Sequence, residues 1–101
     1  MSGKVLVRIT KVMHIDYVMT GHVHIDFIGD VKAELQELVL KYLETKWIKL
    51  NNNEFSVSVL SDELDLGKFK DEVKETVIEA IKWAKNTVDK EDIFVIDVDN
   101  V

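Results

Sequence analysis

The residues best suited to chemistry are histidines and aspartates that lie close together near the N-terminus. The tripeptide His-Ile-Asp occurs twice, at residues 14–16 and 24–26. Imidazole nitrogens and carboxylate oxygens are ligands that zinc, nickel and copper accept. If the two segments pair as antiparallel strands, these side chains share one face of a sheet. One interpretation is therefore a metal-binding protein or a metal-dependent enzyme. Its candidate ligands are His14, Asp16, His22, His24 and Asp26.

The same pattern has a plainer interpretation as a set of structural pairs. Cross-strand His–Asp pairs on a solvated face stabilise a hairpin by a few tenths of a kcal/mol to ~1 kcal/mol each. Acid–base catalysis would also need a nucleophile or a substrate pocket near the histidine. The hydroxyls on candidate faces, Thr10, Thr20, Ser56 and Ser58, belong to no catalytic motif. We favour this interpretation, which predicts no catalytic residue, no metal and no cofactor.

Alternating apolar and polar residues predict that these segments form a long hairpin. The alternation runs from Val5 to Tyr17, with a bulge expected near Lys11, and resumes over residues 23–27. Because cross-strand neighbours share a face, the alternation predicts a three-residue loop at Met19–Gly21, with Gly21 in the left-handed conformation. The pairs in this register are Met13–Phe27, His14–Asp26, Ile15–Ile25, Asp16–His24 and Tyr17–Val23.

Apolar residues at helical spacing predict two amphipathic helices. The first covers Val31–Trp47 and starts after Asp30, whose carboxylate can cap free backbone amides. The second runs from about Lys68 to Asn86, after an acidic segment that contains candidate caps such as Asp65. The residues expected to face the core are Val31, Leu35, Leu38, Val39 and Tyr42 in the first helix, and Phe69, Val73, Val77, Ile81 and Ala84 in the second.

The segment Trp47–Leu50 decides between two folds. If it is a strand, the order is ββαββαβ, and the chain is an α+β protein with a ferredoxin-like βαββαβ core and an extra N-terminal strand. Both helices then pack on one face of a mostly antiparallel sheet. If it is the last turn of the helix, the order is ββαβαβ, a mixed sheet with crossover helices. We favour the first fold.

The two helix-strand units also resemble each other. Val31–Trp47 aligns without gaps to Phe69–Lys85, and the strands Phe55–Val59 and Ile93–Asp97 follow at the same offset. This match predicts two related motifs, at about residues 1–50 and 51–101, within a single domain over residues 1–101. The match depends on the positions of the apolar residues and includes few identical residues. Both a duplication and a chance similarity therefore stay open.

Composition excludes several classes of function. The chain has 19 acidic and 13 basic residues, and its net charge of −6 repels a phosphate backbone, so nucleic acid is not an expected partner. No stretch reaches the ~20 consecutive apolar residues of a membrane-spanning helix, so we expect no membrane association. The absence of cysteine excludes thiol chemistry and suits an intracellular protein. We therefore expect a soluble protein of the cytoplasm.

With catalytic motifs missing, the predicted function is a non-catalytic module that binds protein or peptide, alone or as a homodimer. The expected site is either the groove between the two motifs or an exposed sheet edge, whose unpaired backbone groups accept an extended segment. Ser56 and Ser58 mark that edge. Trp47 and Trp83 lie near the ends of the helical stripes, where they either cover the sheet edge or extend the binding surface.

Two resemblances to known proteins accompany this prediction. The segments Lys11–His14 and Gly21–Phe27 resemble the histidine pattern of the 6-pyruvoyltetrahydropterin synthase family. That resemblance implies a zinc held by three histidines, a cysteine nucleophile and a late substrate-anchoring glutamate. The chain has no cysteine, and no late glutamate lies in a comparable strand, so it departs from the family at the catalytic residues.

The second resemblance covers the whole chain and is compositional. The Lys/Glu-rich helices, the β-branched strands, the missing cysteine and proline and the two-motif layout resemble small orphan proteins of viruses that infect hyperthermophilic archaea. That resemblance implies one compact domain, an interaction role in virus or host, and a location in the host cytoplasm.

Overall fold

The computed structural model describes residues 2–87 and 92–100. Its elements follow the order ββαββαβ, so the segment after Trp47 forms the strand that the favoured prediction required. The alternative order ββαβαβ is wrong. The elements are β1 (Ser2–Ile15), β2 (Val18–Gly29), α1 (Ala33–Glu44), β3 (Ile48–Asn51), β4 (Glu54–Leu60), α2 (Leu66–Thr87) and β5 (Asp92–Asn100).

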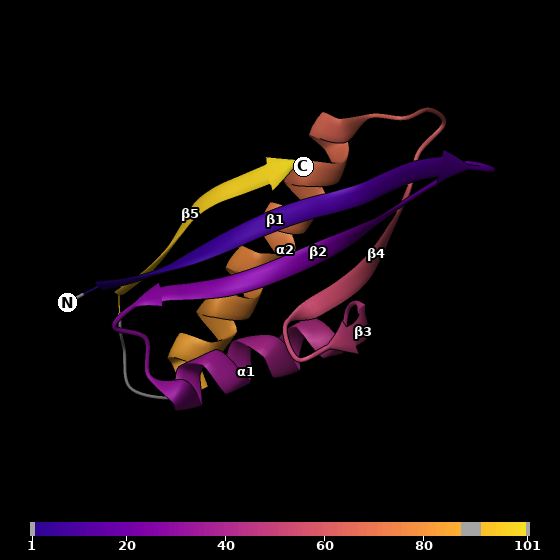
Figure 1. Cartoon of the computed structure of the whole chain (residues 1–101). Coiled ribbons are helices and arrows are strands. Elements are labelled where there is room, and N and C mark those ends of the chain that lie inside the picture. The colour runs from indigo at the N-terminus through magenta and orange to yellow at the C-terminus, as the bar shows by residue number, and fades with distance from the viewer. Residues whose placement is uncertain (1, 88–91, 101) are drawn as a thin grey trace.

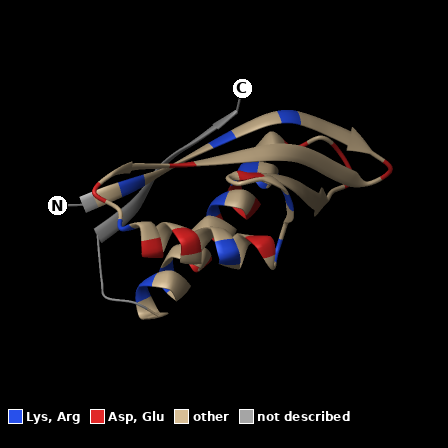
Figure 2. Cartoon of the chain, turned by 60° about the horizontal axis from the view of Figure 1, so that its bottom comes forward, with Lys and Arg blue, Asp and Glu red and all other residues tan. Residues whose placement is uncertain are grey.

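In the described residues the strands form one sheet in the order β3-β4-β2-β1-β5, and both helices cover the same face of it (Figures 1 and 2). Neighbouring strands are antiparallel except β1 and β5, which run parallel. The chain is thus an α+β structure whose antiparallel strands and two helices are compatible with a ferredoxin-like fold. The first strand lies inside the sheet, between β2 and β5.

The order of the elements and the gapless sequence match imply two different pairs of equivalent strands. The βαβ halves of a ferredoxin-like fold would be β2-α1-β3 and β4-α2-β5, in which β3 corresponds to β5. The gapless match instead places Phe55–Val59, in β4, against Ile93–Asp97, in β5. The internal repeat therefore stays a prediction from the sequence.

The β1–β2 hairpin turns earlier than the sequence predicted. Ile15 pairs with Val18, so the connection is the two-residue turn Asp16–Tyr17, and the predicted loop at Met19–Gly21 is wrong. Both turn residues have positive φ, 49° and 66°, as in the type I′ turn whose twist matches that of the flanking strands. The turn escaped prediction because neither of its residues is glycine, the usual sequence signal for positive φ.

A β-bulge near Lys11, which the sequence predicted, changes the face that each later residue of β1 occupies. The pairing register shifts between Thr10 and Met13, and Lys11 has a φ of 56°. One extra residue in a strand inverts the alternation of side chains beyond it. Met13 and Ile15 were predicted to face the core by uninterrupted alternation, and they are instead 56% and 62% exposed.

Gly21 lies within β2, whereas the sequence predicted it in a loop. Its lack of a side chain allows close packing at this position. A Cβ atom at this position would lie 2.9 Å from Cζ of Phe69 in α2 and 3.1 Å from Cγ2 of Val12. Phe69 is fully buried, so its ring has little freedom to move away. The absence of a side chain at Gly21 lets α2 approach the hairpin.

The second helix agrees closely with its prediction. The five residues expected to face inward from α2 are all buried. Asp65 caps the helix, because its carboxylate accepts a hydrogen bond of 3.0 Å from the amide of Lys68. No helix in the described part of the chain is long and apolar enough to cross a lipid bilayer.

The first helix is shorter than predicted. It begins at Ala33, three residues beyond the expected cap Asp30, and ends at Glu44, before Trp47. It buries Leu43, which the predicted stripe omitted. The core forms between this helix, α2 and the inner face of the sheet, and its largest fully buried side chains include Phe55, Phe69, Ile9, Met19, Ile25, Leu35 and Leu43.

Candidate interaction surface

The face of the sheet away from the helices, here called the open face, carries a polar cluster of five side chains. The Asp26 carboxylate lies 3.5 Å from Nη2 of Arg8 and 3.3 Å from Nε2 of His24. Nδ1 of His22 lies 3.5 Å from Oε2 of Glu54 on β4. All five side chains retain partial solvent exposure, and ion pairs of this kind stabilise a fold by ~0–1 kcal/mol. The cluster therefore connects three strands without enclosing a reaction site.

The hairpin register separates the five candidate metal ligands. His14 pairs with Met19 on the helix side, whereas His24 lies on the open face, so the predicted contacts of His14 with Asp26 and of His24 with Asp16 are wrong. At ~3.3 Å per residue, Met19 and His24 are ~16 Å apart along β2. Among the described residues, no group of three or more His, Asp or Glu side chains could hold a metal ion.

His14 has a structural contact of its own at the end of the hairpin. Its Nε2 lies 2.9 Å from the backbone oxygen of Ser61, and the amide of Ser61 donates a hydrogen bond of 2.9 Å to the backbone oxygen of Tyr17. These contacts hold the segment that follows β4 against the hairpin turn. These contacts could not be predicted from the sequence because Ser61 is 47 residues from His14.

Apolar side chains gather on the open face beside the hairpin turn, and we call Met13, Ile15, Val18 and Leu60 the distal apolar patch. Leu60 pairs with Val18, which pairs with Ile15, so these three form one row across β4, β2 and β1. Leu60 is 75% exposed and Ile15 is 62% exposed. Sequence analysis missed Leu60, although it shares the alternation of the outward-facing Ser56 and Ser58. Exposed apolar groups of this kind mark interaction sites.

The outer side of β4 is unpaired beyond Ser56, and we call the segment Val57–Leu60 the β4 edge. Here β3 pairs with β4 only as far as Ile48 and Ser56, whereas β2 pairs with β4 up to Leu60. In Figure 1, β4 continues toward the hairpin end past the short β3. Ser56 thus lies opposite the first residue of β3, and Ser58 lies on the unpaired edge.

The two tryptophans lie in different places. Trp47 is half-buried beside the start of β3, where its ring packs edge-on against Phe55 with centroids 5.8 Å apart. Trp83 lies on α2 and contacts Tyr42 of α1, with centroids 5.7 Å apart. That contact joins the two helices at their seam, where a groove between the motifs was expected. Trp47 is therefore near the β4 edge, and Trp83 belongs to the helical layer.

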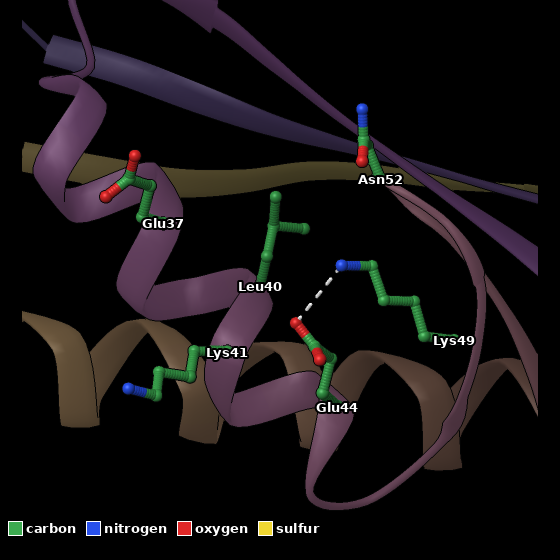
Figure 3. A pocket seen from close by; sticks show the side chains of 6 residues that line it. All are labelled: Glu37, Leu40, Lys41, Glu44, Lys49 and Asn52. Atoms are coloured by element: carbon green, nitrogen blue, oxygen red, sulfur yellow. Dashed lines mark hydrogen bonds and ion pairs between the residues drawn. The ribbon is translucent and has the colours of Figure 1, made fainter.

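A surface groove of about 480 Å³ lies between α1 and the β3–β4 turn (Figure 3). Its lining is charged and balanced, with two glutamates and two lysines around Leu40. Nζ of Lys49 lies 3.5 Å from Oε2 of Glu44, which links β3 to the end of α1. Both ends of this pair are exposed, so the groove is a solvated surface. The residues that line it are Glu37, Leu40, Lys41, Glu44, Lys49 and Asn52.

The candidate interaction surface consists of the distal apolar patch and the adjoining β4 edge. Their residues come from β1, β2 and β4 at the end of the sheet opposite the chain's N-terminus (Figure 1). Comparison with models of protein families, with curated proteins and with solved structures finds no match for the chain.

Proposed function

We propose that the chain is a non-catalytic module that binds a protein or an extended peptide by strand addition at the β4 edge. A strand added to an edge gains main-chain hydrogen bonds, and its alternate side chains contact the surfaces on either side of the sheet. On the open face such side chains would lie beside Ser58 and Leu60. Apolar residues of the partner would find Leu60 and the rest of the distal apolar patch there.

The observation that carries this proposal is a difference between the two free edges near the hairpin turn. In the part of the chain that the structure describes, pairing of β5 with β1 ends at Ile9, so Thr10–Ile15 forms a second edge. That edge contains the bulge and the exposed charge of Lys11, two devices that block strand addition. The β4 edge, Val57–Leu60, has no charge and no proline, and its pairing with β2 has no register shift.

Selection of extended peptides from a random library on the immobilised protein tests the proposal. We expect Ser58→Lys to abolish capture of the selected peptides, because an edge lysine prevents strand pairing. Ser58 is exposed, so this variant should stay folded, as circular dichroism would verify. The matched control is Ile28→Lys near the other end of β2, outside the distal apolar patch and the β4 edge, which should bind the peptides as the parent chain does. Equal capture by Ser58→Lys and the parent chain would refute strand addition at this edge.

The proposal includes the finer assignments made from the sequence. These are a ferredoxin-like core with two related motifs, a location in the cytoplasm, and partners that are proteins or peptides. A metal-dependent function is not included, because His14 and His24 lie on opposite faces of the hairpin.

A further inference from the structure

The β4 edge fits a second copy of this chain, an inference that rests on the proposed function of that edge. We propose that two copies associate by antiparallel pairing of their β4 edges about a two-fold axis at Val59. A strand that pairs with itself in this way needs no second complementary surface, because a two-fold interface uses the same residues on both copies. Each copy then satisfies the unpaired backbone groups of the other.

The position of β3 fixes the register of this pairing. The outer side of Ser56 is already occupied by Ile48 of β3. An axis at Ser58 would place Leu60 of the second copy against Ser56, where β3 lies. An axis at Val59 places Leu60 against Ser58, which is free. Both residues face the open side, and side chains of paired residues must share a face.

This register brings together the two large apolar side chains that are most exposed among the described residues. Leu60 is 75% exposed and Ile48 is 68% exposed. Both lie on the open face, because Ile48 pairs with Ser56. Since β3 of the second copy begins where β4 of the first copy ends, Leu60 of one copy and Ile48 of the other lie about two residues apart, ~7 Å along the strand direction. Symmetry repeats this contact.

Charges at the same junction are complementary. The loop after β4 carries the exposed acids Asp62 and Glu63, and the exposed base Lys46 precedes the start of β3. The neighbouring Lys49 is already paired with Glu44. The two-fold register places Asp62 of one copy next to the start of β3 in the other. Attraction between these groups offsets the general repulsion between two chains that each have a net charge of −6.

Sedimentation velocity of the full chain over a range of concentrations tests the inference. We expect the 11.6 kDa chain to form a reversible species of twice that mass. Leu60→Lys should raise the dissociation constant by about tenfold or more, because it places a charge beside an apolar group at the centre of the interface. Ile28→Lys is the matched control, since Ile28 is an exposed apolar residue near the other end of β2, outside both the distal apolar patch and the β4 edge, and it should leave the dissociation constant unchanged.

Charge reversal gives a second measurement. Lys46→Glu should weaken association, and adding Asp62→Lys in the same chain should restore it. A monomer at every concentration, or equal effects of Leu60→Lys and Ile28→Lys, would overturn the inference. Peptide capture by a monomeric chain would still support the proposed function, so the two proposals can fail separately.

Discussion

The two-residue turn at Asp16–Tyr17 can be tested by two substitutions at Tyr17 whose order of stability depends on where the hairpin turns. Tyr17 has a φ of 66° and its side chain is 67% exposed. We compare Tyr17→Gly with Tyr17→Val. Both remove the same aromatic ring, so the lost burial cancels in large part, and the difference in unfolding free energy reports the backbone conformation.

The expected difference follows from the positive φ. A left-handed conformation costs a residue with a Cβ atom about 1–2 kcal/mol, and a β-branched residue is especially rare there. Glycine avoids this cost and gives up ~0.5–1 kcal/mol of conformational entropy. The Gly variant should therefore be more stable than the Val variant by about 1 kcal/mol. If Tyr17 were in a strand, as the predicted register required, Val would be the more stable by about 1 kcal/mol.

Urea denaturation followed by the fluorescence of Trp47 and Trp83 measures this difference. Ser58 provides the control, because it is an exposed strand residue on β4. There the order should be reversed, with Ser58→Val more stable than Ser58→Gly. A Tyr17→Val variant at least as stable as Tyr17→Gly would refute the turn at Asp16–Tyr17 and with it the face assignment of the whole hairpin.

Two further predictions concern the packing of β2 and the histidines. Gly21→Ala should destabilise the fold by ~1–3 kcal/mol, because its Cβ would lie 2.9 Å from Cζ of Phe69. Gly67→Ala should stabilise α2 by up to ~1 kcal/mol, because the nearest atom to its Cβ would be 3.5 Å away. Urea titration of both glycine variants measures these changes, and two changes of the same sign would contradict the prediction. Added zinc should leave the melting temperature unchanged, since the hairpin separates His14 from His24. Native mass spectrometry that finds one bound zinc per chain, lost in the His24→Ala variant, would contradict this.

Much of the fold could be predicted because both helices and the strands β1, β2 and β4 each have one buried face. The spacing of Phe69, Val73 and Val77 determined the buried side of α2, and these residues are all in the core. The hairpin could not be predicted in the same way. A single bulge residue, Lys11, inverts the alternation beyond it, and a turn built from Asp16 and Tyr17 has no glycine to mark it.

The candidate surface could be predicted only in part. The alternation of Ser56 and Ser58 with Phe55 and Val57 predicted which side chains of β4 face outward, and their burial in the structure follows this pattern. The same alternation puts Leu60 on the open face, so this residue could have been found from the sequence. Whether β4 has a free edge could not, because that depends on the strand order and on where β3 stops.

The two proposed roles of the β4 edge exclude each other, and this has a consequence for both. A peptide that pairs with Val57–Leu60 must displace the second copy, so its apparent affinity should fall as protein concentration rises. The paired segment is short, so its interface is expected to lie below the ~800 Å² per partner of a stable complex and to exchange readily. Two-fold pairing also covers Leu60 and stops further growth of the sheet at this side, while the bulge and charge of Lys11 block strand addition at β1. Self-association would in this way protect an exposed apolar edge that remains available to a partner.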